Sequence, residues 1–293
     1  MKEKDKYWIW LSIFKDLKNK TIQELIKKFG TIEEIYKAKK KELLTVNGIN
    51  EDIADQMTNE IYKRKTYKYQ KCMEKNNIDI ISIESEEYPN ILRQIYDMPI
   101  YLFVKGNKSI LNGMNIAIIG CRQATNYGIE TAKNIAYKLA LKNINIVSGL
   151  AKGIDTSAHI GTLNAKGRTI AVLGSGLDII YPKENYIIAN EIVNRGGILI
   201  SEYIPGTMPE KFHFPQRNRI ISGLSIGVVV VEAKEKSGSM ITVDFALEQG
   251  RDIFAVPGSI NWRNSVGCNK LISEGAVLVQ KPEDILEYYS QNK

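Results

Sequence analysis

From Asn115 onward the sequence alternates short apolar runs with stretches of helical periodicity. The first run, Ile116-Ala-Ile-Ile119, ends at Gly120, and an apolar stripe with helical spacing follows it over 129–139. Six later runs have the same character and lie at 144–147, 169–173, 198–200, 226–231, 253–256 and 276–279. Continuous apolar runs predict strands that are buried on both faces, which is typical of parallel sheets covered by helices. The sequence therefore predicts an α/β fold, an extended Rossmann-like, doubly wound and mostly parallel sheet.

The residues before this region have a different pattern, in which one short helical stretch follows another. Thr21-Ile-Gln-Glu24 and Thr31-Ile-Glu-Glu34 both have the form of a capping box, so each predicts a helix start. Val46-Asn-Gly-Ile49 joins two predicted helices through a tight glycine turn and resembles a helix-hairpin-helix of the sterile-alpha-motif-like (SAM-like) class. Asn50 stands where such hairpins often carry a second glycine, which favours a structural or interaction module over a DNA site.

Between these regions the pattern changes near residue 78. Ile78 to Ile81 and Pro99 to Val104 predict strands, and no Gly/Ser-rich linker separates them from the rest of the chain. We therefore expect a small all-helical SAM-like or helix-hairpin-helix-like domain at 1–75 and a Rossmann-like domain at 76–293.

Composition narrows the range of partners. The formal net charge is +7 and the pI is about 9.0, which favours a polyanion such as nucleic acid as the partner.

The cysteines and the apolar segments indicate the cellular compartment. Cys72, Cys121 and Cys268 lie far apart, which indicates a reducing compartment without disulfides or a zinc site. The apolar run at 7–14 is too short to span a bilayer and lacks a signal-peptide cleavage site. We expect a cytoplasmic protein without a membrane partner.

In a doubly wound sheet, ligands bind outside the carboxyl ends of the strands, so the loops after the strands are the candidate site. Glycine or serine follows nearly every predicted strand, and the amides and hydroxyls of such loops bind anions. The loops are Gly120-Cys-Arg122, 148–155, 174–178, Ser201-Glu202, 232–239 and 257–259.

The segment 211–225 combines cations and phenylalanines with an apolar helical tail. Pro215 predicts a loop at Phe214-Pro215 and a helix after it, which places Arg217, Asn218 and Arg219 in the first turn, where phosphate binds well. The alternative is ordinary: an arginine pair near a helix start is often solvated or ion-paired, and Phe beside Pro is often core.

Other chemistries fit this sequence less well. No Gly-x-Gly-x-x-Gly follows the first strand, and no Walker loop occurs. His159 and His213 have no metal-ligand spacing, so we expect neither a metal nor a cofactor. Asp155 is expected to cap the helix that begins beside it. Lys152 and Lys183 are lone cations that contact an anion only if the basic segment lines the same cleft.

A crevice with backbone donors, cations and exposed rings, but no acid/base pair, suits single-stranded nucleic acid. The cations expected around it are Arg122, Lys183, Lys211, Arg217 and Arg219, and the aromatic side chains are Tyr181, Phe212 and Phe214.

Ordered motifs across this region resemble the DNA-processing protein A family, DprA, also called Smf. They are Gly120-Cys-Arg122 with Tyr127-Gly128, Ser148-Gly-Leu-Ala-Lys-Gly-Ile-Asp155, Gly176-Leu-Asp-Ile-Ile-Tyr-Pro182, Ser201-Glu202, Phe214-Pro-Gln-Arg-Asn-Arg-Ile-Ile221, Ser237-Gly-Ser239, Gly250-Arg251, Val256-Pro-Gly-Ser259 and Gly267-Cys-Asn-Lys-Leu-Ile272, with Tyr88-Pro89 and Asp97-Met-Pro99 upstream. No single motif is specific, but their order is.

The resemblance implies a non-enzymatic bacterial recombination mediator. Such a protein binds incoming single-stranded DNA in natural transformation, protects it, helps to load the RecA recombinase and tends to dimerise. By motif position it assigns the DNA site to Gly120, Arg122, Lys183, Lys211, Phe214, Arg217, Asn218 and Arg219. A homodimer interface is expected near Asn269 to Leu278.

This sequence departs from the family pattern in two places. Cys121 stands where the first loop usually has serine, which puts one hydroxyl contact to phosphate in doubt. Many members also carry a C-terminal winged-helix domain, which we do not expect here because the chain ends at Lys293.

Two other function classes stay open at this stage. Nucleotide phosphoribohydrolases of the lysine-decarboxylase-like type share this Rossmann branch, and Asp244 is the residue that their catalytic acid would require here. An interaction scaffold without DNA affinity is the third possibility, and the basic segment counts against it.

Overall fold

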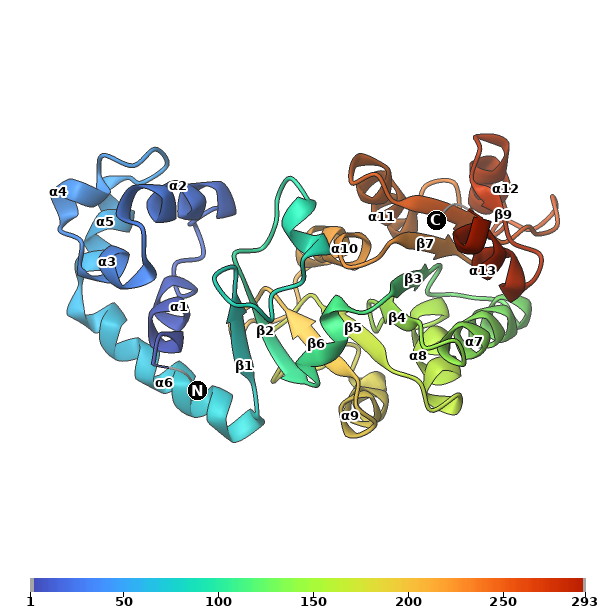
Figure 1. Cartoon of the computed structure of the whole chain (residues 1–293), viewed down its shortest axis with the longest axis horizontal. Coiled ribbons are helices and arrows are strands. Elements are labelled where there is room, and N and C mark those ends of the chain that lie inside the picture. Colours follow the sequence, from blue (N-terminus) through green and yellow to red (C-terminus); the bar gives the residue numbers. More distant parts are fainter. Residues whose placement is uncertain (1–2, 292–293) are drawn as a thin grey trace.

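The computed structural model describes residues 3–291 and contains a helical unit followed by a nine-stranded sheet with helices on both faces (Figure 1). The helical unit is at the left of Figure 1 and runs in order through α1 (Asp5–Leu11), α2 (Asn19–Phe29), α3 (Ile32–Lys37), α4 (Lys40–Leu43), α5 (Glu51–Thr58) and α6 (Glu60–Asn76).

One of the two predicted helix caps in this unit is confirmed and the other is wrong. The Thr31 hydroxyl accepts a hydrogen bond from the Glu34 amide at 3.3 Å, as a capping residue does. Helix α2 instead begins at Asn19, so Thr21 lies inside it and is buried. The reason is tertiary packing: Thr21 fills the space beside Gly48, where an added Cβ would come within 2.4 Å of the Thr21 Oγ1.

The predicted glycine turn between α4 and α5 is confirmed. Gly48 has φ +91°, a backbone conformation that favours glycine. Asn50, which replaces the second glycine of related hairpins, caps α5 by accepting a hydrogen bond from the Ile53 amide at 2.8 Å.

The sheet has the strand order β1-β2-β6-β5-β4-β3-β7-β8-β9. Its strands are β1 (Asp79–Ser82), β2 (Tyr101–Gly106), β3 (Asn115–Ile119), β4 (Asn145–Ser148), β5 (Thr169–Leu173), β6 (Ile198–Ser201), β7 (Gly227–Val230), β8 (Asp252–Ala255) and β9 (Val277–Leu278). The pairs β1–β2 and β2–β6 are antiparallel and the other pairs are parallel. The predicted mostly parallel, doubly wound sheet is confirmed.

Helices cover both faces because neighbouring residues of each strand point to opposite sides. In β3, for example, Ile116 and Ile118 join one apolar cluster, whereas Ala117 and Ile119 join another. The first face is covered by α7 (Asn126–Ala140), α8 (Ile154–Asn164), α9 (Tyr186–Asn194) and α13 (Pro282–Gln291), and the second by α10 (His213–Gly223), α11 (Gly238–Glu248) and α12 (Val266–Ser273). Short 3₁₀ turns complete the fold at η1 (Ile91–Gln94), η2 (Lys108–Asn112) and η3 (Lys183–Asn185).

The helical unit packs on the β1 side of the sheet through one shared apolar cluster. Trp10 and Leu11 of α1 belong to the same buried cluster as Phe103 of β2 and Leu173 of β5. Helix α6 ends at Asn76 and β1 begins three residues later, and the core continues across this junction. The division into separate domains at residues 75 and 76 stays a prediction.

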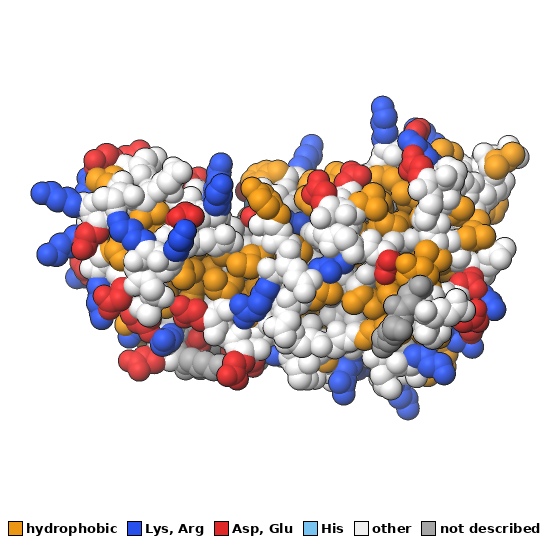
Figure 2. Space-filling view, turned by 45° about the horizontal axis from the view of Figure 1, so that its top comes forward, with side chains coloured by type: hydrophobic (Ala, Val, Ile, Leu, Met, Phe, Trp, Pro, Cys, Tyr) orange, Lys and Arg blue, Asp and Glu red, His pale blue; other side chains and the backbone are white. Residues whose placement is uncertain are grey.

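Among the described residues, no helix combines the length and the apolar character needed to cross a bilayer. On the face drawn in Figure 2, Lys and Arg side chains stand around the rim of the molecule, including over the helical unit at the left, while apolar side chains occupy much of the middle.

Candidate nucleic-acid interface

A pocket of about 720 Å³ opens at the carboxyl ends of the central strands. Strand order reverses between β3 and β7, since β4 lies on one side of β3 and β7 on the other. The loops after β3, β4 and β7 line the pocket together with α10 and the start of α11. This is the topological switch point at which open α/β sheets bind ligands, and the pocket lies at the loops where sequence analysis expected the site.

A row of three planar groups lies along one wall of the pocket. The guanidinium of the exposed Arg122 lies 5.4 Å from the ring centroid of Phe214. The Phe214 ring in turn lies 5.6 Å from the Tyr181 ring, with 37° between their planes. Tyr181 is 45% exposed, so the outer end of the row is open to solvent. Cations and aromatic faces arranged in this way can stack with unpaired bases and neutralise phosphates.

Backbone and small side chains form the base of the pocket. At Gly120 an added Cβ would come within 2.5 Å of the Ile154 side chain, so this position has room for glycine alone. Gly238, the first residue of α11, also lines the pocket, and the first amides of this helix have no partners within it. The Ser237 hydroxyl lies there buried, with no hydrogen-bond partner among residues 3–291. Lys211 and Asn218 also line the pocket, and it can therefore offer several donors to an anion.

Sequence analysis did not single out three polar residues that line the pocket. Lys234, Ser237 and Ser239 line the pocket, although the sequence indicated only the loop to which they belong. The sequence pattern that could have identified them is the Ser-Gly-Ser run between a buried strand and a helix, because small polar residues at the start of a helix often bind anions.

Cys121 directs its thiol to an internal carboxylate. Its Sγ lies 3.4 Å from the Glu232 Oε2, and burial together with this carboxylate raises the pKa of Cys121 to about 12. Glu232 is 1% exposed and also accepts hydrogen bonds from the Thr125 amide and hydroxyl. Glu232, which sequence analysis did not single out, thus fixes the loop after β3 that carries Arg122.

The residue pair Arg217 and Asp155 is buried and organises the loop after β4. The Arg217 guanidinium donates to the carbonyl oxygens of Gly149, at 2.6 Å, and of Val172. Burial lowers the pKa of Arg217 to about 10, and the nearby Asp155 opposes that shift. Asp155 accepts hydrogen bonds from the Gly149 and Ala151 amides, so the expectation that it caps α8 is wrong.

The helix that carries the two arginines begins earlier than expected. Helix α10 starts at His213, so Phe214 and Pro215 lie in its first turn and not in a loop. Pro215 is compatible with this position because the first amides of a helix have no partners. Arg217 and Arg219 consequently lie in the second turn, where the two residues are 5% and 6% exposed.

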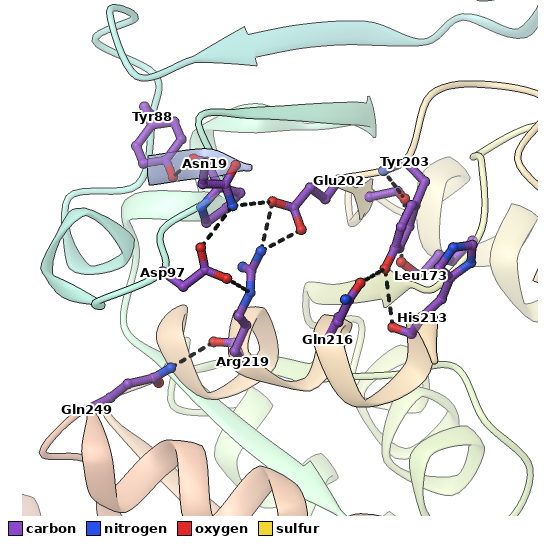
Figure 3. Close-up of polar contacts among 12 residues, drawn as sticks. Asn19, Tyr88, Asp97, Leu173, Glu202, Tyr203, His213, Gln216, Arg219 and Gln249 are labelled. Atoms are coloured by element: carbon purple, nitrogen blue, oxygen red, sulfur yellow. Dashed lines mark hydrogen bonds and ion pairs between the residues drawn. The ribbon is translucent and has the colours of Figure 1, made fainter. Parts of the chain in front are cut away.

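Arg219 points away from the pocket, into a cluster of carboxylates (Figure 3). Its Nη2 lies 2.6 Å from Glu202 and its Nε 3.0 Å from Asp97. Asn19 of α2 donates to the same two carboxylates, at 3.0 Å and 3.2 Å. Arg219 was expected beside phosphate in the site, but it does not line the pocket, and its guanidinium already pairs with two carboxylates within the fold. Through Glu202 and Asn19 it links α10 to the helical unit.

The lone lysines lie outside the pocket. Lys183 is exposed in η3, two residues after Tyr181, and is not part of the pocket wall. Lys152 forms an exposed ion pair with Glu184 at 2.7 Å.

The two residues expected at a dimer interface differ in accessibility. Asn269 exchanges two hydrogen bonds with the Gly258 backbone, at 3.1 and 2.9 Å, and so holds the loop after β8. Leu278 is 40% exposed on β9, the last strand of the sheet.

The geometry gives little support to hydrolytic chemistry. Asp244, the acid that the phosphoribohydrolase alternative requires, is exposed on α11 and does not line the pocket. His159 is buried against Thr169, with Nδ1 at 2.7 Å from its Oγ1, and His213 lies near the Gly174 carbonyl. Residues 3–291 contain no group of three His, Cys, Asp or Glu side chains that is arranged to hold a metal ion.

Comparisons with known proteins identify the family. The family model described as DNA recombination-mediator protein A matches residues 79–290. DNA processing protein DprA of Streptococcus pneumoniae is 49% identical over 205 residues, which is 70% of this chain and 72% of the relative. DprA of Bacillus subtilis is 49% identical over 211 residues, which is 72% of this chain and 71% of the relative.

Solved structures give the same assignment. The crystal structure of DprA from Streptococcus pneumoniae matches with a TM-score of 0.78 and 38% identity, covering 96% of this chain and 97% of that one. DprA from Helicobacter pylori, whose structure was determined to describe a single-stranded DNA binding mode, matches with a TM-score of 0.66 and 31% identity, covering 73% of this chain and 96% of that one. The chain therefore belongs to the DNA recombination-mediator protein A family.

Proposed function

We propose that this protein binds single-stranded DNA, without base specificity, in the pocket at the β3–β7 switch point. The observation that carries the proposal is the row formed by Arg122, Phe214 and Tyr181 along the pocket wall. Stacking on such a row contributes about 1–3 kcal/mol per base and discriminates weakly between bases, because every base has a π-face. The DNA binding described for the Helicobacter pylori relative supports the same assignment.

Within this proposal the expected site residues divide into two groups. Gly120, Arg122, Lys211, Phe214 and Asn218 contact the strand, and Lys183 contacts DNA that leaves the pocket past Tyr181. Arg217 and Arg219 act indirectly: they hold α10 and the loop after β4 in position, so that Phe214 and Asn218 face the pocket.

The test is fluorescence anisotropy of a labelled single strand and of the same sequence as a duplex, over a range of salt concentrations. Arg122→Ala should weaken single-strand binding and reduce its salt dependence, since one phosphate contact is lost. Arg168→Ala is the matched control. Arg168 is exposed just before β5, at the amino-terminal ends of the parallel strands, whereas the pocket lies at their carboxyl ends. Equal affinities of Arg122→Ala and wild type would exclude the pocket as the DNA site.

Membership of the family supports a wider role. We propose that the protein acts in the cytoplasm without catalysing a reaction, protects incoming DNA in competent cells and helps to load RecA in natural transformation. The corresponding measurement is RecA filament formation on a single strand that a single-strand-binding protein already covers, with and without this protein. No acceleration by the wild type would contradict the loading role and leave the DNA-binding proposal intact.

We also propose a homodimer that forms at the β9 edge of the sheet. Leu278→Glu places a charge on an exposed apolar residue, so it should lower the mass measured by light scattering from dimer to monomer. Leu278 is a cleaner position for this test than Asn269, whose amide supports the loop around Gly258. An unchanged mass would contradict this interface.

A further inference from the structure

Helix α6 concentrates positive charge in one short stretch of the chain. Its seventeen residues contain six basic and two acidic side chains, an excess of four out of the formal +7 of the whole chain. The basic side chains are Lys63, Arg64, Lys65, Lys68, Lys71 and Lys75, and the acidic ones are Glu60 and Glu74.

Four of these cations form a stripe on one face of the helix. Arg64, Lys68, Lys71 and Lys75 follow one another at spacings of four, three and four residues, which is the spacing of neighbours on a helix surface. At a rise of about 1.5 Å per residue the stripe is about 16 Å long. All four side chains are exposed, whereas Thr66 and Met73 on the opposite face are buried. The stripe therefore points away from the core.

The described part of the chain supplies no ion-pair partner for the stripe. Lys63, on the flank of the helix, pairs with Glu60 at 3.0 Å. By contrast, within residues 3–291 no carboxylate lies at ion-pair distance from any of the four stripe cations. An aromatic ring borders the stripe as well: Tyr67 is 61% exposed, and the Lys71 Nζ lies 4.6 Å from its ring centroid. Cations next to an exposed ring suit a polyanion with bases.

The carboxyl-terminal end of α6 adjoins the loop that leads to the pocket. Cys72, one position from the stripe, places its Sγ 3.9 Å from the Asp178 Oδ2 in the loop after β5. Asp178 also accepts a hydrogen bond from the Gly206 amide at 2.8 Å, which fixes it in place. Three residues further along the same loop is Tyr181, the outer member of the row in the pocket. The end of α6 therefore contacts the same loop that carries the outer member of the row.

We infer that Arg64, Lys68, Lys71 and Lys75 of α6 form a second contact surface for the same single strand of DNA, beyond the pocket. The inference rests on the proposed function, because the occupant is the strand that the pocket holds. The pocket supplies stacking and a few phosphate contacts, and the stripe supplies further phosphate contacts. The helical unit, which sequence analysis favoured as a structural or interaction module, then contributes directly to DNA binding.

The test compares a short oligothymidylate of about six nucleotides, which is long enough for the pocket alone, with one of about twenty nucleotides. In the stripe variant, Arg64, Lys68, Lys71 and Lys75 are all replaced by Gln. This variant should bind the short strand as the wild type does. It should bind the long strand at least about tenfold more weakly at physiological salt. The slope of log affinity against log salt concentration should be smaller by about 3, because each of the four lost phosphate contacts contributes about 0.7 to that slope.

Two further variants separate the stripe from general charge effects. In the matched control, Lys138, Lys142, Lys166 and Arg168 become Gln, which removes the same charge from exposed positions near the amino-terminal ends of β4 and β5. In the second variant Arg64 becomes Lys and the other three stripe residues become Arg, which keeps the charge and should keep wild-type affinity. A control that loses as much long-strand affinity as the stripe variant would overturn the inference.

Failure of the inference and failure of the proposed function have different signatures. Unchanged long-strand affinity in the stripe variant would overturn the second surface and leave the pocket in place. Unchanged short-strand affinity in Arg122→Ala would overturn the pocket itself.

Discussion

Arg219 places a single guanidinium nitrogen between both carboxylate oxygens of Glu202, with Nη2 at 2.8 Å from Oε1 and 2.6 Å from Oε2 (Figure 3). Both side chains are mostly buried, at 7% and 17% exposed. Asn19 from the helical unit reaches the same carboxylate, so this pair lies where the helical unit, β6 and α10 meet. Because neither residue lines the pocket, breaking this pair tests the stability of the fold separately from DNA binding.

We predict that Glu202→Gln lowers the free energy of unfolding by roughly 3 kcal/mol. A buried guanidinium that loses its charged partner is left uncompensated, and breaking such pairs typically costs about 3–5 kcal/mol. Asp97 still faces Arg219, which places the loss at the lower end. Urea unfolding followed by circular dichroism measures it.

The matched control is Glu235→Gln, which breaks the exposed ion pair between Glu235 and Lys270. Exposed pairs contribute about 0–1 kcal/mol, so the control should unfold almost as the wild type does. Similar losses in both variants would show that Glu202 does not stabilise a buried charge.

The sheet and the position of the candidate pocket were predictable because both depend on local sequence patterns. Apolar runs such as 116–119 and 226–231 identify buried strands, and the chain order of strands and helices then places the ligand at the carboxyl ends. Arg122 was expected in the site because it follows the first of these strands, and Phe214 because the segment 211–225 combines cations with aromatic rings; both line the pocket.

The orientation of buried polar side chains was not predictable. Arg217 and Arg219 are two residues apart on one helix, so they project in different directions, one to the Gly149 carbonyl and one to Glu202. Which partner each one meets depends on β6 and the loop after β4, which lie far away in sequence. The same holds for Thr21, whose burial beside Gly48 overrides its capping pattern.

A second prediction distinguishes Arg217 from Arg122, which sequence analysis both expected to contact DNA. Arg217→Met should lower the free energy of unfolding by roughly 2–3 kcal/mol, because the carbonyl oxygens of Gly149 and Val172 lose their buried donor. Arg122→Met should leave stability unchanged, since Arg122 is exposed, but weaken single-strand binding. Thermal unfolding and anisotropy on both variants test this division. Equal stability losses in the two would contradict it.

A third prediction concerns the phenylalanines on either side of His213. Phe214→Ala should weaken single-strand binding by about 1–3 kcal/mol, which is the contribution of one stacked base. Phe212 is 56% exposed but does not line the pocket, so Phe212→Ala should bind nearly as the wild type does. Anisotropy with one labelled oligonucleotide compares the two. If Phe212→Ala causes the larger loss, the strand does not follow the row that contains Phe214.

The last prediction is a loss of stability in acid that depends on His159. This ring is fully buried, and burial, with a smaller contribution from Arg217, lowers the pKa of His159 to about 3. The unfolded chain binds the proton near the ordinary pKa of about 6.5, so protonation favours unfolding once the pH falls below that value. The stability that neutral, buried His159 gives to the folded protein is therefore fully present above about pH 6.5, and it is lost progressively as the pH falls toward 3. Between pH 7 and pH 5 the loss should amount to about 2 kcal/mol.

The measurement is urea unfolding at a series of pH values for the wild type and His159→Gln. Glutamine does not titrate, so the variant should be less stable at pH 7, because the contact with Thr169 changes, yet should lose less stability on acidification. His213, whose pKa burial also lowers, is present in both proteins, and its contribution cancels in the comparison. Parallel stability curves for the two proteins would mean that His159 takes up a proton in the folded state as readily as in the unfolded one.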